Sequence, residues 1–160
     1  MSINVIRSAD RWYVDRDGRA AAIETSARTT AELLADRAAV EAASSAPVPA
    51  DAPLVGEMEL QSPVTTPCRV VAQAVNSRTH AQDSGFDPAR VPTTFFRKSS
   101  ASVSGPTSPI TRPSHVRLLD YEVELGLVFG TPLALGTTVT AATLGDYVAG
   151  LVVTNDVYAR

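Results

Sequence analysis

Two glutamates, Glu122 and Glu124, lie two positions apart within residues 118–129, a stretch dominated by apolar and β-branched side chains. This composition, ended by Gly130 and Pro132, predicts a buried β-strand. Side chains two positions apart in a strand project from the same face, so the two carboxylates should lie side by side. Like charges at that separation repel, and a hard divalent cation, which prefers oxygen ligands, would offset the repulsion. The alternative is that both glutamates line the hydrated face of an edge strand.

A third carboxylate follows the next apolar run. Residues 147–154 predict a second buried strand, and Asp156 comes directly after it. An acid at the point where a buried strand gives way to a loop is a common place for a ligand or a catalytic group. If the two strands are neighbours, Glu122, Glu124 and Asp156 form one cluster that leaves other cation positions open to substrate or water. We therefore predict a three-carboxylate metal site.

A histidine with an acidic neighbour lies upstream. His80 and Asp83 are three positions apart in a segment that predicts a loop and a short helical turn, closed by Gly85. On a helical turn this spacing puts both side chains on one face. A carboxylate beside an imidazole orients the ring and raises its basicity, as a general base requires. The alternative is a surface histidine beside a solvated aspartate.

Two cationic side chains are candidates for substrate contact. Lys98 ends a predicted strand, residues 93–98, at the edge of a polar loop, and could hold a substrate carboxylate or a developing oxyanion. Arg78 has the same potential. The alternative for each is an ordinary solvated side chain, which is the commoner role of a lysine at a strand end.

The first part of the chain predicts a small separate unit. Residues 4–23 read as a β-hairpin with a glycine-containing turn at 15–18. Thr29 and Glu32 have capping-box spacing and predict one helix that ends by residue 45. Three prolines in residues 46–53 then predict an extended linker. We therefore expect an N-terminal unit at 1–46, a linker at 47–61 and a second unit at 62–160.

Composition narrows the class of protein. The chain has 160 residues, of which 44 % are hydrophobic, and a formal net charge of −3, which gives no electrostatic case for binding nucleic acid. Cys68 is the only cysteine, so no intrachain disulfide can form and a reducing compartment is expected. No apolar run approaches membrane-spanning length. These features predict a soluble, cytoplasmic chain with neither a nucleic-acid nor a membrane partner.

Taken in order, five segments resemble the fumarylacetoacetate hydrolase family. They are residues 75–81, 95–100, 104–106, 120–125 and 147–160. The resemblance runs from about residue 62 to residue 160, and the leading hairpin, helix and linker look like the small N-terminal domain that many members carry. The resemblance implies an α+β, mainly β fold, a mixed β-sandwich roll preceded by a small hairpin-plus-helix domain.

The resemblance also implies roles for individual residues. It assigns a divalent metal, Mg²⁺ foremost with Mn²⁺ or Ca²⁺ as alternatives, to Glu122, Glu124 and Asp156. His80 becomes a general base carried by a lid, with Asp83 where many members have a glutamate, and Lys98 a substrate or oxyanion contact. Fumarylacetoacetate hydrolase itself has a further aspartate ligand seven residues before the histidine. Gln73 stands there, which favours the three-carboxylate site.

The implied activity is hydrolysis of a C–C bond in a small 2-oxo or β-dicarbonyl acid, of the kind met in the catabolism of aromatic compounds. Isomerisation or decarboxylation by the same enolate chemistry is the first alternative. Members of the family are usually homodimers. Because the family's catalytic domain continues beyond the Asn-Asp motif at 155–156, this chain is expected to carry only its first half. A non-catalytic, truncated remnant is therefore the second alternative.

Overall fold

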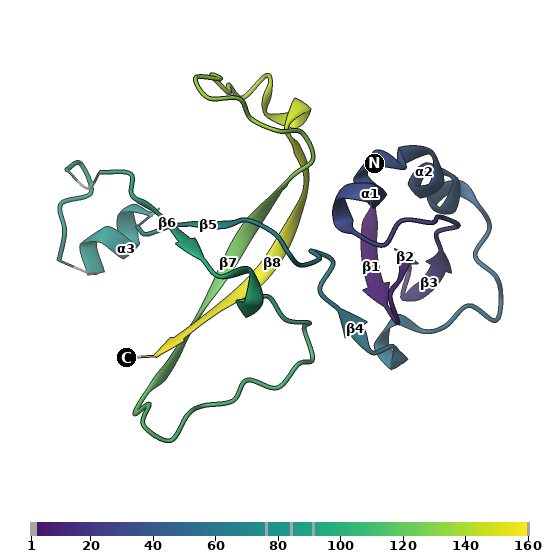
Figure 1. The fold of residues 1–160 in the computed structure, drawn as a ribbon, viewed down its shortest axis with the longest axis horizontal. Helices are drawn as coiled ribbons and strands as arrows, with labels where there is room; N and C mark the ends of the chain where they lie inside the picture. The colour runs from purple at the N-terminus through teal and green to yellow at the C-terminus, as the bar shows by residue number, and fades with distance from the viewer. Residues whose placement is uncertain (1–2, 76, 84, 91, 160) are drawn as a thin grey trace.

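The computed structural model describes residues 3–75, 77–83, 85–90 and 92–159 (Figure 1). The described chain is mostly β-structure with few helices. Its strands are β1 (Asn4–Ser8), β2 (Arg11–Arg16), β3 (Arg19–Ala22), β4 (Leu60–Gln61), β5 (Val70–Gln73), β6 (Phe95–Lys98), β7 (Leu119–Phe129) and β8 (Val148–Ala159). Its α-helices are α1 (Thr30–Ala35), α2 (Arg37–Ser45) and α3 (Arg78–Asp83), and short 3₁₀ turns cover Val55–Glu57, Ser100–Ser102 and Leu144–Asp146.

The N-terminal strands form an antiparallel sheet in the order β3-β2-β1-β4. Two-residue turns connect the first three strands. Ala9 and Asp10 both have positive φ, as do Asp17 and Gly18, and turns of this kind match the twist of a hairpin. The predicted hairpin is therefore present, but its second turn is tighter than residues 15–18, because β2 continues through Arg16.

The predicted single helix is two helices. Thr29 and Glu32 form the capping box that starts α1, as the sequence predicts. The chain then breaks at Asp36, whose carboxylate accepts the backbone N–H of Ala39 and the hydroxyl of Thr25 at 2.6 Å. A side chain that satisfies the first N–H groups of a new helix competes with continuation of the old one. The pattern of apolar residues alone does not reveal this break.

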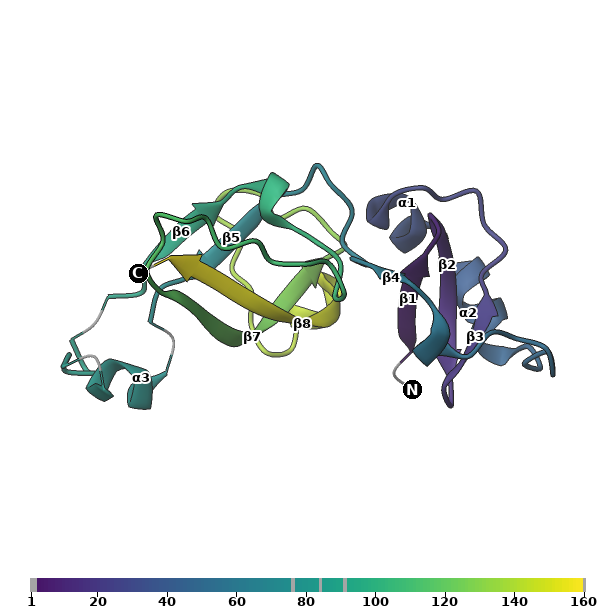
Figure 2. The ribbon, with the colours of Figure 1, turned by 90° about the horizontal axis from the view of Figure 1, so that it is seen from below.

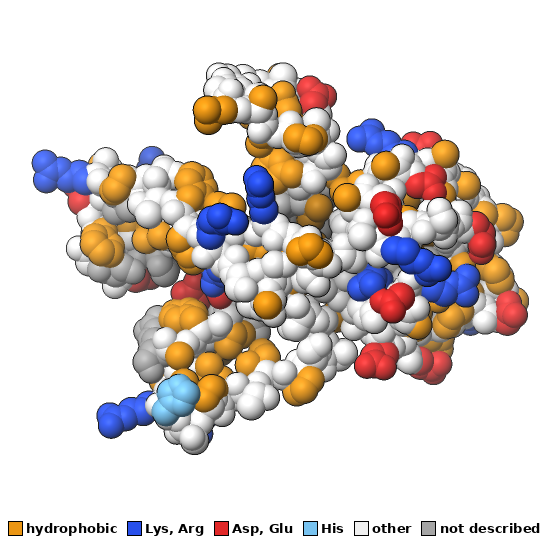
Figure 3. Space-filling model, in the orientation of Figure 1, with side chains coloured by type: hydrophobic (Ala, Val, Ile, Leu, Met, Phe, Trp, Pro, Cys, Tyr) orange, Lys and Arg blue, Asp and Glu red, His pale blue; other side chains and the backbone are white. Residues whose placement is uncertain are grey.

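The core of the N-terminal unit lies between its sheet and its helices (Figure 2). Trp12 and Val14 of β2 are almost fully buried and pack with Leu33 of α1 and Ala43 of α2. The indole N–H of Trp12 donates to the carbonyl of Ala27 at 3.0 Å, so the ring is buried without an unpaired donor. On the face shown in Figure 3, acidic and basic side chains are scattered over this unit among uncharged ones.

The segment predicted as a linker, residues 47–61, contacts the N-terminal sheet at several points. Ala20 N–H donates to the carbonyl of Pro53, and Val55 N–H donates to that of Gly18, each at 2.9 Å. At its end, β4 pairs with β1. The segment is not extended throughout, because the chain turns at residues 50–51 and forms a 3₁₀ turn at Val55–Glu57, and its contacts with the sheet hold it in place. The division at residues 46 and 61 stays a prediction.

The remaining strands form two antiparallel pairs, β5–β6 and β7–β8. In Figure 1, β7 and β8 form one long twisted ribbon. Both predicted strands are present, but neither is fully buried, because only one face of the ribbon is partly covered in the described chain. Side chains alternate, and one face is open, with Val123 76 % and Val153 73 % exposed. No described element packs on that face. β5 is likewise partly open, since its Val71 side chain is 60 % exposed.

The last strand is also longer than predicted. β8 continues to Ala159, so Asp156 lies inside a strand rather than in a following loop. Among the described helices, none is long and apolar enough to cross a membrane.

Candidate metal centre

The antiparallel register of β7 and β8 brings the three predicted carboxylates together. Glu122 lies directly opposite Asp156, and Glu124 lies opposite Thr154. Residues paired in this way share one face of the ribbon, and residues two apart along a strand share it too. One carboxylate oxygen from each of Glu122, Glu124 and Asp156 lies within 4.8 Å of the others. All three side chains are half-buried.

The electrostatics of this cluster favour a cation. Burial raises the pKa of the Glu124 carboxyl above its ordinary value, and the nearby charges of Asp156 and Glu122 raise it further, while Lys98 opposes the shift. Three carboxylates that repel one another in a partly desolvated site are stabilised by a hard cation. The donor set therefore fits Mg²⁺, Mn²⁺ or Ca²⁺, each of which prefers oxygen ligands.

Lys98 reaches this cluster from the neighbouring strand pair. It is the last residue of β6, and its ammonium forms an ion pair with Asp156. The same ammonium lies 5.4 Å from the centre of the Phe96 ring. The sequence suggested Lys98 for contact with substrate or an oxyanion. The structure places its charge directly beside a predicted metal ligand.

A residue that the sequence analysis missed completes the face. The hydroxyl of Tyr158 donates to Glu122 Oε1 at 3.1 Å and lies 3.4 Å from Asp120 Oδ2. Tyr158 lies two positions after Asp156, so the strand periodicity that paired Glu122 with Glu124 could have found it. It was missed because the predicted strand ended at residue 154.

The other predicted residues lie on α3. Arg78 and Asp83 are exposed, and no hydrogen bond or ion pair between the described residues links either side chain to the carboxylates. His80 belongs to α3, but its side chain lies outside the described part of the chain, so its pairing with Asp83 stays a prediction. In Figures 1 and 2, α3 lies apart from the β7–β8 ribbon, on the left of both views.

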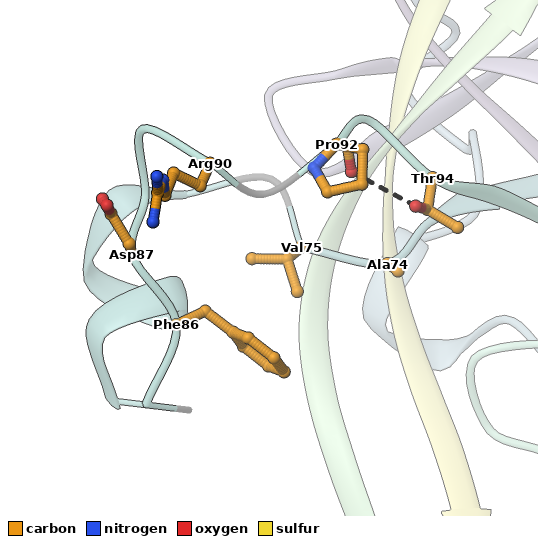
Figure 4. A pocket seen from close by; sticks show the side chains of 7 residues that line it. All are labelled: Ala74, Val75, Phe86, Asp87, Arg90, Pro92 and Thr94. Atoms are coloured by element: carbon orange, nitrogen blue, oxygen red, sulfur yellow. Dashed lines mark hydrogen bonds between the residues drawn. The ribbon is translucent and has the colours of Figure 1, made fainter.

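A shallow cavity of about 310 Å³ lies beside α3, between the end of β5 and the start of β6 (Figure 4). It is mainly apolar, with two charged side chains at one end. Its lining residues are Ala74, Val75, Phe86, Asp87, Arg90, Pro92 and Thr94. The hydroxyl of Thr94 donates to the carbonyl of Pro92 at 3.2 Å, which ties the turn that enters β6. Arg90 is not among the residues that the sequence predicts for a site.

Comparison with known proteins gives the site its context. Residues 69–160 match the family model described as fumarylacetoacetate (FAA) hydrolase, C-terminal. The chain is 33 % identical over 113 residues to the mitochondrial oxaloacetate tautomerase Fahd2a of Rattus norvegicus, a match that covers 69 % of this chain and 35 % of that protein. It is 36 % identical over 113 residues to a protein assigned as a hydrolase from Burkholderia multivorans, covering 70 % of this chain and 39 % of the relative.

A solved structure is similar over nearly the whole chain. It is the crystal structure of a protein assigned as HpcE from Mycobacterium smegmatis, with a TM-score of 0.75 and 25 % sequence identity. The match covers 98 % of this chain and 55 % of the Mycobacterium smegmatis chain. The chain spans less than half the length of the two curated relatives named above. Since the family model covers more than half of the chain and takes in the whole carboxylate cluster, the chain belongs to the fumarylacetoacetate hydrolase family.

Proposed function

We propose that this chain carries the metal-binding part of an enzyme that hydrolyses a C–C bond in a small 2-oxo or β-dicarbonyl acid. Membership of a catalytic family supports an enzyme of the hydrolase and isomerase type. The observation that carries the finer proposal is the carboxylate cluster, in which oxygens of Glu122, Glu124 and Asp156 lie within 4.8 Å of one another beside a lysine ammonium. A chelating 2-oxo acid is the class of substrate that such a centre suits.

Each residue has a role in this proposal. Glu122, Glu124 and Asp156 would hold a divalent cation, Mg²⁺ foremost, which when bound supplies Lewis acidity to a carbonyl oxygen. The Lys98 ammonium would bind the substrate's carboxylate. An imidazole nitrogen of His80 would accept a proton from water, and Asp83 would orient the ring. The hydroxyl from water ends on the acyl carbon, and its proton ends on the departing carbon of the 2-oxo acid.

Tautomerisation of a 2-oxo acid is the second candidate. It is favoured by one specific observation, that relatives from Rattus norvegicus and Homo sapiens are named oxaloacetate tautomerases. This reaction moves a proton between carbon and oxygen and consumes no water. It would use the same carboxylates and Lys98, and would not need His80 to activate water. Decarboxylation remains a variant of the same enolate chemistry.

The test uses the whole gene product in which residues 1–160 occur, and not an isolated piece of it. It is assayed with an acylpyruvate, by loss of the β-dicarbonyl absorbance, and with enol-oxaloacetate, by its conversion to the keto form. Activity should require Mg²⁺ or Mn²⁺ and should fall at least about 100-fold in Glu122→Gln, because a metal ligand is lost. Glu41→Gln, at an exposed position of α2, is the matched control. Full turnover by Glu122→Gln in chelator would contradict the proposal.

Comparing the two substrates separates the candidates. Cleavage products from the acylpyruvate support the hydrolase, whereas ketonisation without cleavage supports the tautomerase. Cation binding without turnover of either substrate would favour the non-catalytic alternative.

The remaining expectations also stay proposals. We propose that the complete fold is the mixed β-sandwich roll, that the protein is a homodimer, and that it is cytoplasmic. Analytical ultracentrifugation tests the second of these and fractionation the third. The rat relative is named as mitochondrial, so fractionation has to include that compartment where it exists.

A further inference from the structure

The positively charged side chain beside the carboxylate cluster belongs to a residue type that this chain uses only once. Lys98 is the sole lysine among the 160 residues, whereas the chain has thirteen arginines. It is also the residue whose ammonium pairs with Asp156, a predicted metal ligand 58 positions away. The one place where the chain uses lysine is therefore the place where a basic side chain meets the predicted metal site.

Lysine and arginine behave differently at such a position. An arginine guanidinium grips a carboxylate with two parallel hydrogen bonds in a fixed geometry. A lysine ammonium is a single point charge on a flexible stem, so it can leave one oxygen and remain nearby. The Lys98 side chain is 26 % exposed and that of Asp156 13 %, which leaves the ammonium a path toward solvent.

We propose that Lys98 is a built-in counter-ion of the carboxylate cluster, which an incoming divalent cation displaces from Asp156. This inference rests on the proposed metal centre. In the cation-free chain the ammonium offsets part of the mutual repulsion of Glu122, Glu124 and Asp156. A divalent cation bound to the same oxygens repels the ammonium and takes its place on Asp156, because like charges cannot share one small cluster without cost.

Displacement would also couple two binding events. Once freed from Asp156, the ammonium is available to the anionic group of a substrate. Cation binding would therefore raise the affinity for a small carboxylate, and the carboxylate would raise the affinity for the cation by the same factor.

The first experiment measures cation affinity by calorimetric titration of Mg²⁺ and Mn²⁺ into the cation-free gene product. Lys98→Met removes the competing charge and should bind about tenfold more tightly, the scale of one close charge–charge interaction. Lys98→Arg should bind several-fold more weakly, because the fork would hold Asp156 more firmly. Arg97→Met removes the same charge from the adjacent, exposed position of β6 and should change affinity less than about twofold.

The second experiment follows Lys98 itself in the unmutated protein. Reductive ¹³C-methylation keeps the positive charge and labels amines alone, and the Lys98 signal is identified by its absence from Lys98→Met. Adding Mg²⁺ should move that signal at the same concentrations that saturate the calorimetric site. This readout does not depend on activity, or on the Lys98→Arg variant folding normally.

The outcomes separate the two levels of the argument. If the unmutated protein binds Mg²⁺ but Lys98→Met binds it equally or more weakly, or the Lys98 signal stays still on saturation, the counter-ion inference is wrong and the metal centre stands. If the unmutated protein binds neither Mg²⁺ nor Mn²⁺, both the inference and the proposed metal centre fail.

Discussion

At the scale of single residues, the carboxylate cluster is unevenly compensated. Asp156 has the Lys98 ammonium and Glu122 has the Tyr158 hydroxyl. Glu124 has a raised pKa instead, caused first by burial and then by the charges of Asp156 and Glu122. The residue that gains most from a bound cation is therefore Glu124, and the pH dependence of the cation-free protein should reveal it.

The first prediction concerns Glu124 and pH. The pKa of the Glu124 carboxyl is raised above the ordinary 4.5 in the folded chain. Between the ordinary pKa and the raised one, the folded chain therefore binds more protons than the unfolded chain. The stability that Glu124 contributes is therefore fully present below the ordinary value and lost as pH rises through the raised value. Glu124→Gln removes this loss, so it should raise the Tm of the cation-free protein at about pH 7 and leave it unchanged near about pH 4.

The measurement is thermal unfolding, in chelator and across this pH range, of the gene product used in the activity assays and not of the 160-residue chain alone. Glu41→Gln on the exposed side of α2 is the control and should leave the Tm unchanged throughout. A Glu124→Gln variant that melts below the unmutated protein at neutral pH would contradict the stated electrostatics.

The second prediction concerns the proposed base. In the active gene product, His80→Ala should lower kcat on a cleavable 2-oxo acid by about 10²–10⁴-fold, the usual effect of losing a general base. Cation affinity should hardly change, since His80 is not a proposed ligand. Asp83→Asn should lower kcat less, because it would orient the ring without taking the proton. Loss of cation binding with turnover intact would show that the role assignment is wrong.

At the scale of elements, the site depends on how closely β7 and β8 approach. Gly126 lies opposite Val152, and a Cβ built at Gly126 would meet Val152 Cγ1 at 2.8 Å. Val is branched at Cβ and has few alternative rotamers, so it cannot easily move aside. The glycine therefore sets the local spacing of the ribbon two residues away from Glu124.

The third prediction follows from this contact. Gly126→Ala should lower the free energy of unfolding by about 1–3 kcal/mol, as overpacking commonly does, and should weaken Mn²⁺ binding by shifting β7 against β8. Gly150→Ala is the matched control on β8, because its Cβ would meet nothing within 4 Å. Denaturant unfolding and Mn²⁺ titration of both variants provide the measurement. Equal effects of the two substitutions would disprove the steric explanation.

At the scale of the whole molecule, the two parts of the chain differ in how well they are covered. The N-terminal unit closes a core around Trp12 and Val14. The β7–β8 ribbon leaves large apolar side chains open on one face, among them Leu125 at 64 % and Leu151 at 63 % exposure. An apolar face of this kind associates with other surfaces in water.

The fourth prediction concerns the 160-residue chain expressed by itself. Calorimetry should show no single cooperative transition, the chain should bind a hydrophobic dye, and it should hydrolyse no 2-oxo acid. Leu125→Ser should reduce dye binding because it interrupts the open face. Leu135→Ser is the control, since Leu135 is fully exposed but lies outside the ribbon. A sharp melting transition with metal-dependent turnover would overturn this view of the molecule.

The sequence by itself determined the features that depend on near neighbours. Strand periodicity put Glu122 and Glu124 on one face, the Thr29–Glu32 spacing started α1, and Gly85 adopted the positive φ expected at the end of a helical turn. The order of the short motifs was enough to indicate the family. These features are encoded within a few residues, so local sterics and hydrogen bonding decide them.

Only the tertiary structure decided which distant residues meet. The register of β7 against β8 places Asp156 opposite Glu122, and the β5–β6 pair delivers Lys98 to the same carboxylate. Strand register depends on pairing across a long connection, and a shift of one residue would have turned Asp156 to the other face. The sequence therefore supplied the charges of the site, and the folded chain decided which of them neutralise one another.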